Sequence, residues 1–166
     1  MTRVELQELA NEMLTKAKSN LEDHGKLVPV CIFLNCKGEQ QLVLGLIFDS
    51  NESKRAGCKM IEQKIAEVEP AAIITINDAW FKVMDQQEFE RRRSTGISTD
   101  SERKECIIVS VSSRDGEDIF INQLYHRDQG KIVWDEVINH EGDVVKNNMI
   151  SPLWKSRPTK EKVASN

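Results

Sequence analysis

The chain has 166 residues, of which 39% are hydrophobic and 30% are charged, and its formal net charge is −4. This length and composition are typical of one globular domain and exclude collagen-like and low-complexity classes. The longest apolar runs, 27–34 and 42–48, are far shorter than the roughly 20 residues of a membrane-spanning helix. The amino terminus also lacks the basic and apolar blocks of a secretory signal. We therefore expect a cytoplasmic protein with no membrane association.

Two helices are predicted from capping residues and helical spacing. Thr2 and Glu5 have the spacing of a capping box, and the apolar positions that follow share one helical face as far as Gly25, which ends the helix. Residues 49–51 supply capping side chains for a second helix, whose apolar positions again share one face. Pro70 ends this second helix.

Six strands are predicted around these helices. Leu27–Asn35 and Gln41–Phe48 are apolar on both alternating faces and are separated by a turn, which predicts a hairpin of two well-buried strands. Ala72–Ile76 is a third strand that extends towards Phe81. A meander of three strands follows, over residues 106–112, 119–125 and 132–138.

The order α-β-β-α-β-β-β-β predicts an α+β domain. We expect a single, mostly antiparallel sheet of about six strands with two main helices packed on one face. Residues 82–104 are polar and mixed in charge, which predicts a long exposed loop with one helical turn around Phe89. The domain is expected to span residues 1–154, and residues 155–166 are expected to form a flexible basic tail.

The four cysteines do not have the spacing of a metal site. No two of Cys31, Cys36, Cys58 and Cys106 are separated by only two residues, and three of them fall inside apolar elements. Buried, reduced thiols are typical of a reducing compartment. We predict no metal site and no cofactor.

The strongest candidate for catalysis is the sequence Tyr125-His126-Arg127-Asp128, which closes a strand at a turn. A base, a cation and a carboxylate meet there, so His126 and Asp128 are the catalytic candidates of a small hydrolase-like enzyme. The alternative is an ordinary hairpin end with a solvated histidine, which we favour.

Two further groups of polar residues are candidates for a catalytic or cation-binding site. Asp49 and Asp78 each follow an apolar strand, so they would form a carboxylate pair if the strand ends lay together. Otherwise Asp49 begins a helix and Asp78 ends a strand. His140 and the acidic residues of 141–143 either bind a cation or form a solvated turn, and we favour the turn.

The binding candidates are basic and aromatic. Arg91, Arg92 and Arg93 are the most concentrated positive feature and would grip an acidic partner, unless they belong to a solvated loop. Trp80 and Trp154 are candidates for an exposed contact surface, with core packing as the alternative. The acidic body disfavours nucleic acid as a partner, although the basic tail and the three arginines leave a weaker hypothesis of RNA or DNA binding.

Several short motifs carry a resemblance to a family: His24-Gly25-Lys26, Ala79-Trp80, Arg103-Lys104-Glu105 and Asp115-Gly116. Over about residues 20–140 the chain resembles an uncharacterised family of small prokaryotic cytosolic α+β proteins with no assigned function. The resemblance implies a prokaryotic or phage-like cytosolic protein, and it carries over no catalytic residue.

The leading hypothesis is a non-catalytic cytosolic domain that binds another protein or itself as a homodimer. It would use the 82–104 loop and an open edge of the sheet, because an antiparallel sheet of this kind has unpaired edge strands. The hydrolase-like enzyme with His126 and Asp128 is the alternative.

Overall fold

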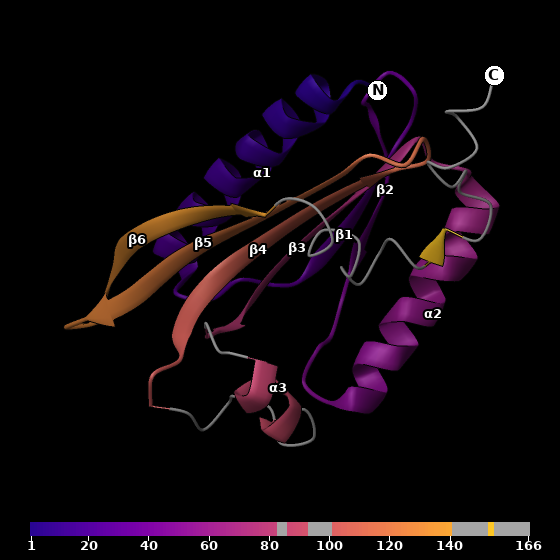
Figure 1. Cartoon of the computed structure of the whole chain (residues 1–166). Helices are drawn as coiled ribbons and strands as arrows, with labels where there is room; N and C mark the ends of the chain where they lie inside the picture. Colours follow the sequence, from indigo (N-terminus) through magenta and orange to yellow (C-terminus); the bar gives the residue numbers. More distant parts are fainter. Residues whose placement is uncertain (83–85, 93–100, 141–152, 155–166) are drawn as a thin grey trace.

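The structure is a computed structural model that describes residues 1–82, 86–92, 101–140 and 153–154. Within them, six strands form one antiparallel sheet in the order β2-β1-β3-β4-β5-β6 (Figure 1). The helices are α1 (Arg3–His24), α2 (Asn51–Val68) and α3 (Gln86–Arg92). The strands are β1 (Val30–Leu34), β2 (Gln40–Gly45), β3 (Ala72–Phe81), β4 (Lys104–Ser113), β5 (Asp118–Asp128) and β6 (Lys131–His140). The predicted fold class, an α+β domain with one antiparallel sheet, is confirmed.

Helix α1 begins and ends as its sequence predicts. The Thr2 hydroxyl accepts a hydrogen bond from the Glu5 amide at 3.3 Å, and the Glu5 carboxylate accepts one from the Thr2 amide at 2.7 Å. Gly25 ends the helix with a φ of 69°, a left-handed conformation that favours glycine. One face of the helix is buried, through Leu6, Ala10, Leu14, Ala17 and Leu21.

The prediction that both helices pack on one face of the sheet is wrong, because α1 and α2 cover opposite faces. Alternate residues of β3 belong to different cores: Ile74 packs in the α1 core, whereas Ile73 packs in the α2 core. In β1, Leu34 faces α1 and Phe33 faces α2. Both strands are central and apolar on both faces, so each face needs its own cover. Figure 1 shows the two helices on either side of the sheet.

The two cores differ in extent. The α1 core is the larger, because α1 crosses β3, β4 and β5. The α2 core gathers residues of β1, β2, β3 and α2, and it also includes Trp154 near the carboxyl end of the chain. β1 contributes Leu34 to the α1 core, with Val30 and Ile32 packed against it, whereas among the described residues none of β2 belongs to that core.

The helical turn expected around Phe89 is present as α3, whereas residues 83–85 and 93–100 of the expected loop lie outside the described residues. Lys82 has a side chain only 8% exposed, and its ammonium group contacts the carboxylates of Glu88 and Glu102, each at 3.0 Å. This ion pair ties α3 to the end of β3. The expected basic tail, residues 155–166, lies outside the described residues.

None of the helices in the described ranges is long and apolar enough to cross a membrane.

The burial of α1 predicts a large loss of stability when its apolar face is truncated. We expect Leu21→Ala to lower the free energy of unfolding by about 2–5 kcal/mol, because Leu21 is fully buried. The control is Val4→Ala on the same helix, where Val4 is 68% exposed, and it is expected to change stability by less than about 0.5 kcal/mol. Urea unfolding measures both. Equal effects of the two substitutions would contradict this placement of α1.

Candidate functional site

β2 is an open edge of the sheet, since it pairs with β1 alone among the described strands. The amide of Leu46 donates to the Pro29 carbonyl at 2.7 Å, which makes these two residues a hydrogen-bonded pair of the ladder. Hydrogen-bonded and non-bonded pairs alternate in an antiparallel ladder. Val43 and Gly45 occupy the non-bonded positions opposite β1, so their N–H and C=O groups point away from the sheet. The edge therefore offers backbone groups for another strand.

The surface around these outward groups is apolar and uncharged. Residues 40–48 contain no charged side chain. Val43 is 42% exposed, and Val28 and Ile47 are exposed as well. Gly45 has open space where a side chain would lie, and its φ is not in the left-handed region, so no local strain requires glycine there. In a strand, a glycine marks a bulge, a tight bend or a place where a ligand or another backbone approaches closely. We call β2 and the following residues to Ile47 the β2 edge.

The ladders of both edge strands contain an irregularity, which in β2 falls at Gln41, but the opposite edge, β6, also carries charged side chains. Its ladder with β5 contains a bulge, in which Leu124 lies opposite both Asp135 and Glu136. The buried Gln123 amide group holds this bulge by donating to the carbonyls of Leu124 at 2.9 Å and Asp135 at 3.0 Å. Bulges and charged side chains are the features that protect an edge strand from further pairing. The two edges of the sheet are thus unequal.

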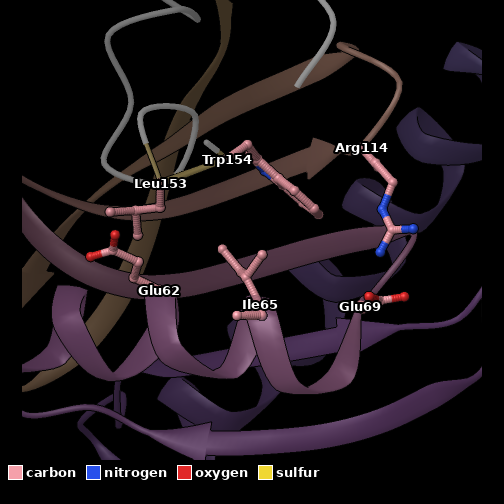
Figure 2. A pocket seen from close by; sticks show the side chains of 7 residues that line it. Glu62, Ile65, Glu69, Arg114, Leu153 and Trp154 are labelled. Carbon is pink, nitrogen blue, oxygen red and sulfur yellow. The ribbon is translucent and has the colours of Figure 1, made fainter. Parts of the chain in front are cut away.

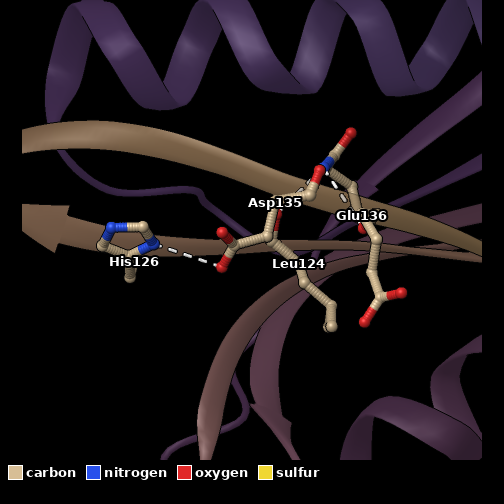
Figure 3. A network of polar contacts seen from close by, with 5 residues as sticks. Leu124, His126, Asp135 and Glu136 are labelled. Carbon is tan, nitrogen blue, oxygen red and sulfur yellow. Dashed lines mark hydrogen bonds and ion pairs between the residues drawn. The ribbon is translucent and has the colours of Figure 1, made fainter.

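The bulge also places Asp135 beside His126. Its Nδ1 lies 3.2 Å from the Asp135 carboxylate across the ladder (Figure 3). Asp128 lies two residues further along the same strand, paired in register with Lys131. In the described part of the chain, no hydrogen bond or ion pair joins Asp128 to His126. The predicted catalytic pair is therefore not brought together, and Asp135 takes the place expected for Asp128.

Asp78 lies near a different carboxylate from the one expected. Asp49 precedes α2 on one face of the sheet, whereas the register places Asp78 on the α1 side. Its neighbours there are Glu105, Tyr125 and Arg127 from β4 and β5. Arg127 contacts the Glu105 carboxylate at 3.4 Å and donates to the Gly25 carbonyl at 3.0 Å. This cluster lies where α1 ends, and sequence reasoning missed Glu105 as a member because the strand register is not visible in a sequence.

The cluster shifts the protonation of its members. Desolvation by the surrounding protein raises the pKa of Asp78, a hydrogen bond to its own backbone opposes the change, and the negative charge of Glu105 raises the pKa further. The positive charge of Arg127 lowers it. Burial likewise raises the pKa of Tyr125 to about 12, so its hydroxyl stays protonated at neutral pH. The cluster thus holds a carboxylate that is more basic than usual.

The binding candidates lie in separate places. Trp80 is 42% exposed and is stacked under the Arg103 guanidinium, whose carbon lies 3.9 Å from the ring centroid. Arg91 is exposed, and its side chain lies 4.0 Å from Glu88. The side chain of Arg92 and the whole of Arg93 lie outside the described residues. Their role as a partner site stays a prediction.

Trp154 lies in the core rather than on the surface. It is only 6% exposed, packs among the residues of the α2 core, and donates from Nε1 to the Ser112 hydroxyl at 2.9 Å. The position agrees with the alternative of core packing and leaves little of the ring for a partner. Trp154 also forms one wall of a cavity of about 300 Å³ between α2 and the sheet (Figure 2). Arg114 and Glu69 lie at one end of this cavity, so its rim carries both charges.

Within the part of the chain that the structure describes, two buried polar atoms on the α2 side of β5 and β6 have no hydrogen-bond partner: Asn122 Oδ1 and His140 Nε2. The His140 ring lies 5.0 Å from the ring of Phe120, and burial lowers the pKa of His140. Residues 141–143, expected beside His140 as a cation site or turn, lie outside the described residues. Within the described ranges, no group of three or more His, Cys, Asp or Glu side chains is placed to hold a metal ion.

All four cysteines are free thiols. Burial raises the pKa of Cys31 and of Cys106 to about 12, and Asp78 adds to the effect at Cys106. These two thiols are therefore poor nucleophiles. Cys58 is half-buried and Cys36 is exposed.

The different burial of the two tryptophans predicts unequal losses of stability when each is truncated. We expect Trp154→Ala to lower the free energy of unfolding by about 3–5 kcal/mol, because it empties part of the α2 core and leaves Ser112 without its partner. Trp80→Ala is the matched control and is expected to cost less than about 1 kcal/mol. Thermal and urea unfolding of both variants test the assignment, which a larger loss at Trp80 would overturn.

The charges around Asp78 predict how its titration responds to substitution. We expect the Asp78 carboxyl to titrate above its ordinary value of 3.8, Glu105→Gln to lower that pKa, and Arg127→Gln to raise it. Carbon-13 NMR of the side-chain carboxyl across a pH titration measures each value. An unchanged Asp78 pKa in both variants would show that the cluster is not electrostatically coupled.

With the geometry described, the chain can be compared with known proteins. No curated protein and no solved structure matches it. Residues 1–166 match the family model described as bacteriophage lambda protein ea47, so the match extends over the whole chain. The chain therefore belongs to the family of bacteriophage lambda protein ea47.

Proposed function

We propose that the protein is a non-catalytic self-association module that forms a homodimer by pairing the β2 edge of one copy with the β2 edge of another. The observation that carries the proposal is an uncharged edge strand whose Val43 and Gly45 backbone groups point outward. Strand addition satisfies such groups with main-chain hydrogen bonds, and the side chains of alternate residues give specificity.

Charge supports a second copy as the partner. The protein carries a net charge of −4, so two copies repel each other unless they meet through a neutral surface. Residues 40–48 are such a surface, and they lie on the edge that a new strand needs. A different protein as the partner is an outcome that the test below distinguishes.

The setting of this activity is also a proposal. Membership of a bacteriophage family, together with four free cysteines, supports action in the reducing cytoplasm of a bacterial cell. The proposed dimer needs neither a cofactor nor a metal.

The proposal predicts that a charge on the β2 edge separates the copies. We expect Val43→Lys to raise the dissociation constant of the dimer at least tenfold, about 1.4 kcal/mol, because two ammonium groups are brought close together in the paired edges. Native mass spectrometry and light scattering distinguish a particle of 19.0 kDa from one of twice that mass.

The matched control is Val137→Lys on β6. Val137 is 48% exposed against 42% for Val43, so the same charge is added at a similar exposure on the other edge. This variant is expected to stay dimeric. A wild-type protein that is monomeric at all concentrations, or a complex formed only with another protein, would overturn the proposal.

The hydrolase-like enzyme remains the alternative, and one observation favours it. A carboxylate beside a histidine nitrogen, as Asp135 lies beside His126, is the arrangement that orients a general base. Among the described residues, however, no serine, threonine or cysteine side chain hydrogen-bonds to His126. Turnover of an ester substrate that is lost in His126→Ala and kept in Val43→Lys would favour the enzyme.

A further inference from the structure

The geometry of the β2 edge also fixes how two copies fit together, an inference that rests on the proposed function. We propose that the twofold axis of the dimer passes through Leu44, so that Val43 of each copy packs on Gly45 of the other. The backbone restricts the register of the two strands to a few choices, and the positions of the side chains select one of them.

The backbone step follows from the alternation of the ladder. In the regular part of β2, from Leu42 to Gly45, outward N–H and C=O groups belong to Val43 and Gly45, and an irregularity at Gln41 interrupts the alternation. In an antiparallel pair, hydrogen bonds form only where an outward residue lies opposite another outward residue. A symmetric pair of identical strands must also place its twofold axis at the centre of the register. Near the middle of the exposed edge, the axis therefore passes through Val43, Leu44 or Gly45.

With the axis through Leu44, the exposed side chain of Val43 lies opposite a glycine, which has no side chain. Val43 and Gly45 lie on the same side of the sheet, because their register partners Ile32 and Val30 both face α1. Val43 then lies opposite the partner subunit's Gly45, where a side chain would meet nothing within 4 Å in the single copy. Each exposed valine thus fills the space above a glycine, and this happens twice because of the symmetry.

The same register pairs apolar residues on the other side of the sheet. Leu44 lies opposite the partner subunit's Leu44, and it is only partly buried within one copy, where it packs against the α2 core. Residues 40–48 contain no charged side chain, so no charge enters the pairing.

The two neighbouring registers fit less well. An axis through Val43 sets Gly45 opposite Gln41 of the partner subunit, where the irregularity of β2 interrupts the alternation. An axis through Gly45 brings two glycines together and sets Val43 opposite Ile47 of the partner subunit, beyond the end of β2. Only the axis through Leu44 pairs Val43 with Gly45, so that each outward residue meets an outward residue within the regular part of the strand.

Exchanging valine and glycine between positions 43 and 45 tests this register of the dimer. We expect Gly45→Val to weaken the dimer at least tenfold, because two valines then compete for one space. The double variant Val43→Gly with Gly45→Val should restore the affinity to within a few fold of wild type, since it only exchanges the two partners. Gly45→Val leaves the single copy intact, because its side chain enters open space. A Gly45→Val dimer as tight as wild type would overturn the register.

Cysteine cross-linking shows directly which residue lies on the twofold axis of the dimer. The cysteines that are not buried, Cys36 and Cys58, are first replaced by serine. We expect Leu44→Cys to oxidise to a covalent dimer, because a residue on the axis faces itself in a non-hydrogen-bonded pair with Cβ atoms about 4.5–5.5 Å apart. Leu44 contributes to the α2 core, so a second measurement uses exposed positions only: a mixture of Val43→Cys and Gly45→Cys chains should cross-link, and neither alone should.

The outcomes separate the register from the proposed function. Covalent dimers of Val43→Cys alone or of Gly45→Cys alone would move the axis to that residue and overturn the inference while keeping the β2 dimer. A protein of twice 19.0 kDa in native mass spectrometry that forms none of these cross-links would show that another surface dimerises. A wild-type protein that is monomeric would overturn the proposed function and the register together.

Discussion

The burial of β1 and β3 on both faces is the constraint on which the rest of the structure depends. Ile73 and Ile74 are adjacent in β3, and each is fully buried in a different core. A sheet whose central strands are apolar on both sides needs a layer on each side, and α1 and α2 supply these layers. α1 lies over β3, β4 and β5, so β2 receives its cover from the α2 side alone. The exposure of the β2 edge is a consequence of this arrangement.

Local features of the fold could be predicted from the sequence because they depend on neighbouring residues. The capping box of Thr2 and Glu5, the left-handed Gly25 and the hairpin between β1 and β2 all lie where the pattern indicated. The predicted placement of both helices on one face is wrong, although the strands of the first hairpin are apolar on both faces, a pattern that indicates two layers. The sequence does not show that β3 lies beside β1, because strand order depends on contacts between distant parts of the chain.

In the candidate sites too, the functional residue types could be predicted from the sequence, but their neighbours in space could not. Asp78 was recognised as a carboxylate at a strand end, but its neighbour is Glu105 rather than Asp49, because β4 pairs with β3. His126 was recognised as a titratable group at a hairpin, but the bulge brings Asp135 to it instead of Asp128. A polar Gln123 in the middle of an apolar strand was a signal of this bulge. The absence of charge in residues 40–48 was also visible in the sequence, yet only the strand order shows that these residues form an edge.

The bulge between β5 and β6 has a consequence for how far assembly can proceed. A sheet with two equivalent open edges adds strands at both ends, and identical chains then polymerise without limit. In this protein the Gln123 amide holds β6 in a bulged conformation, and Asp135 and Glu136 add negative charge at that edge. In the proposed dimer both β2 edges are used, and the two remaining edges are the bulged β6 strands. In that proposed dimer, growth would end at two copies and the assembly would be a closed particle rather than a fibre.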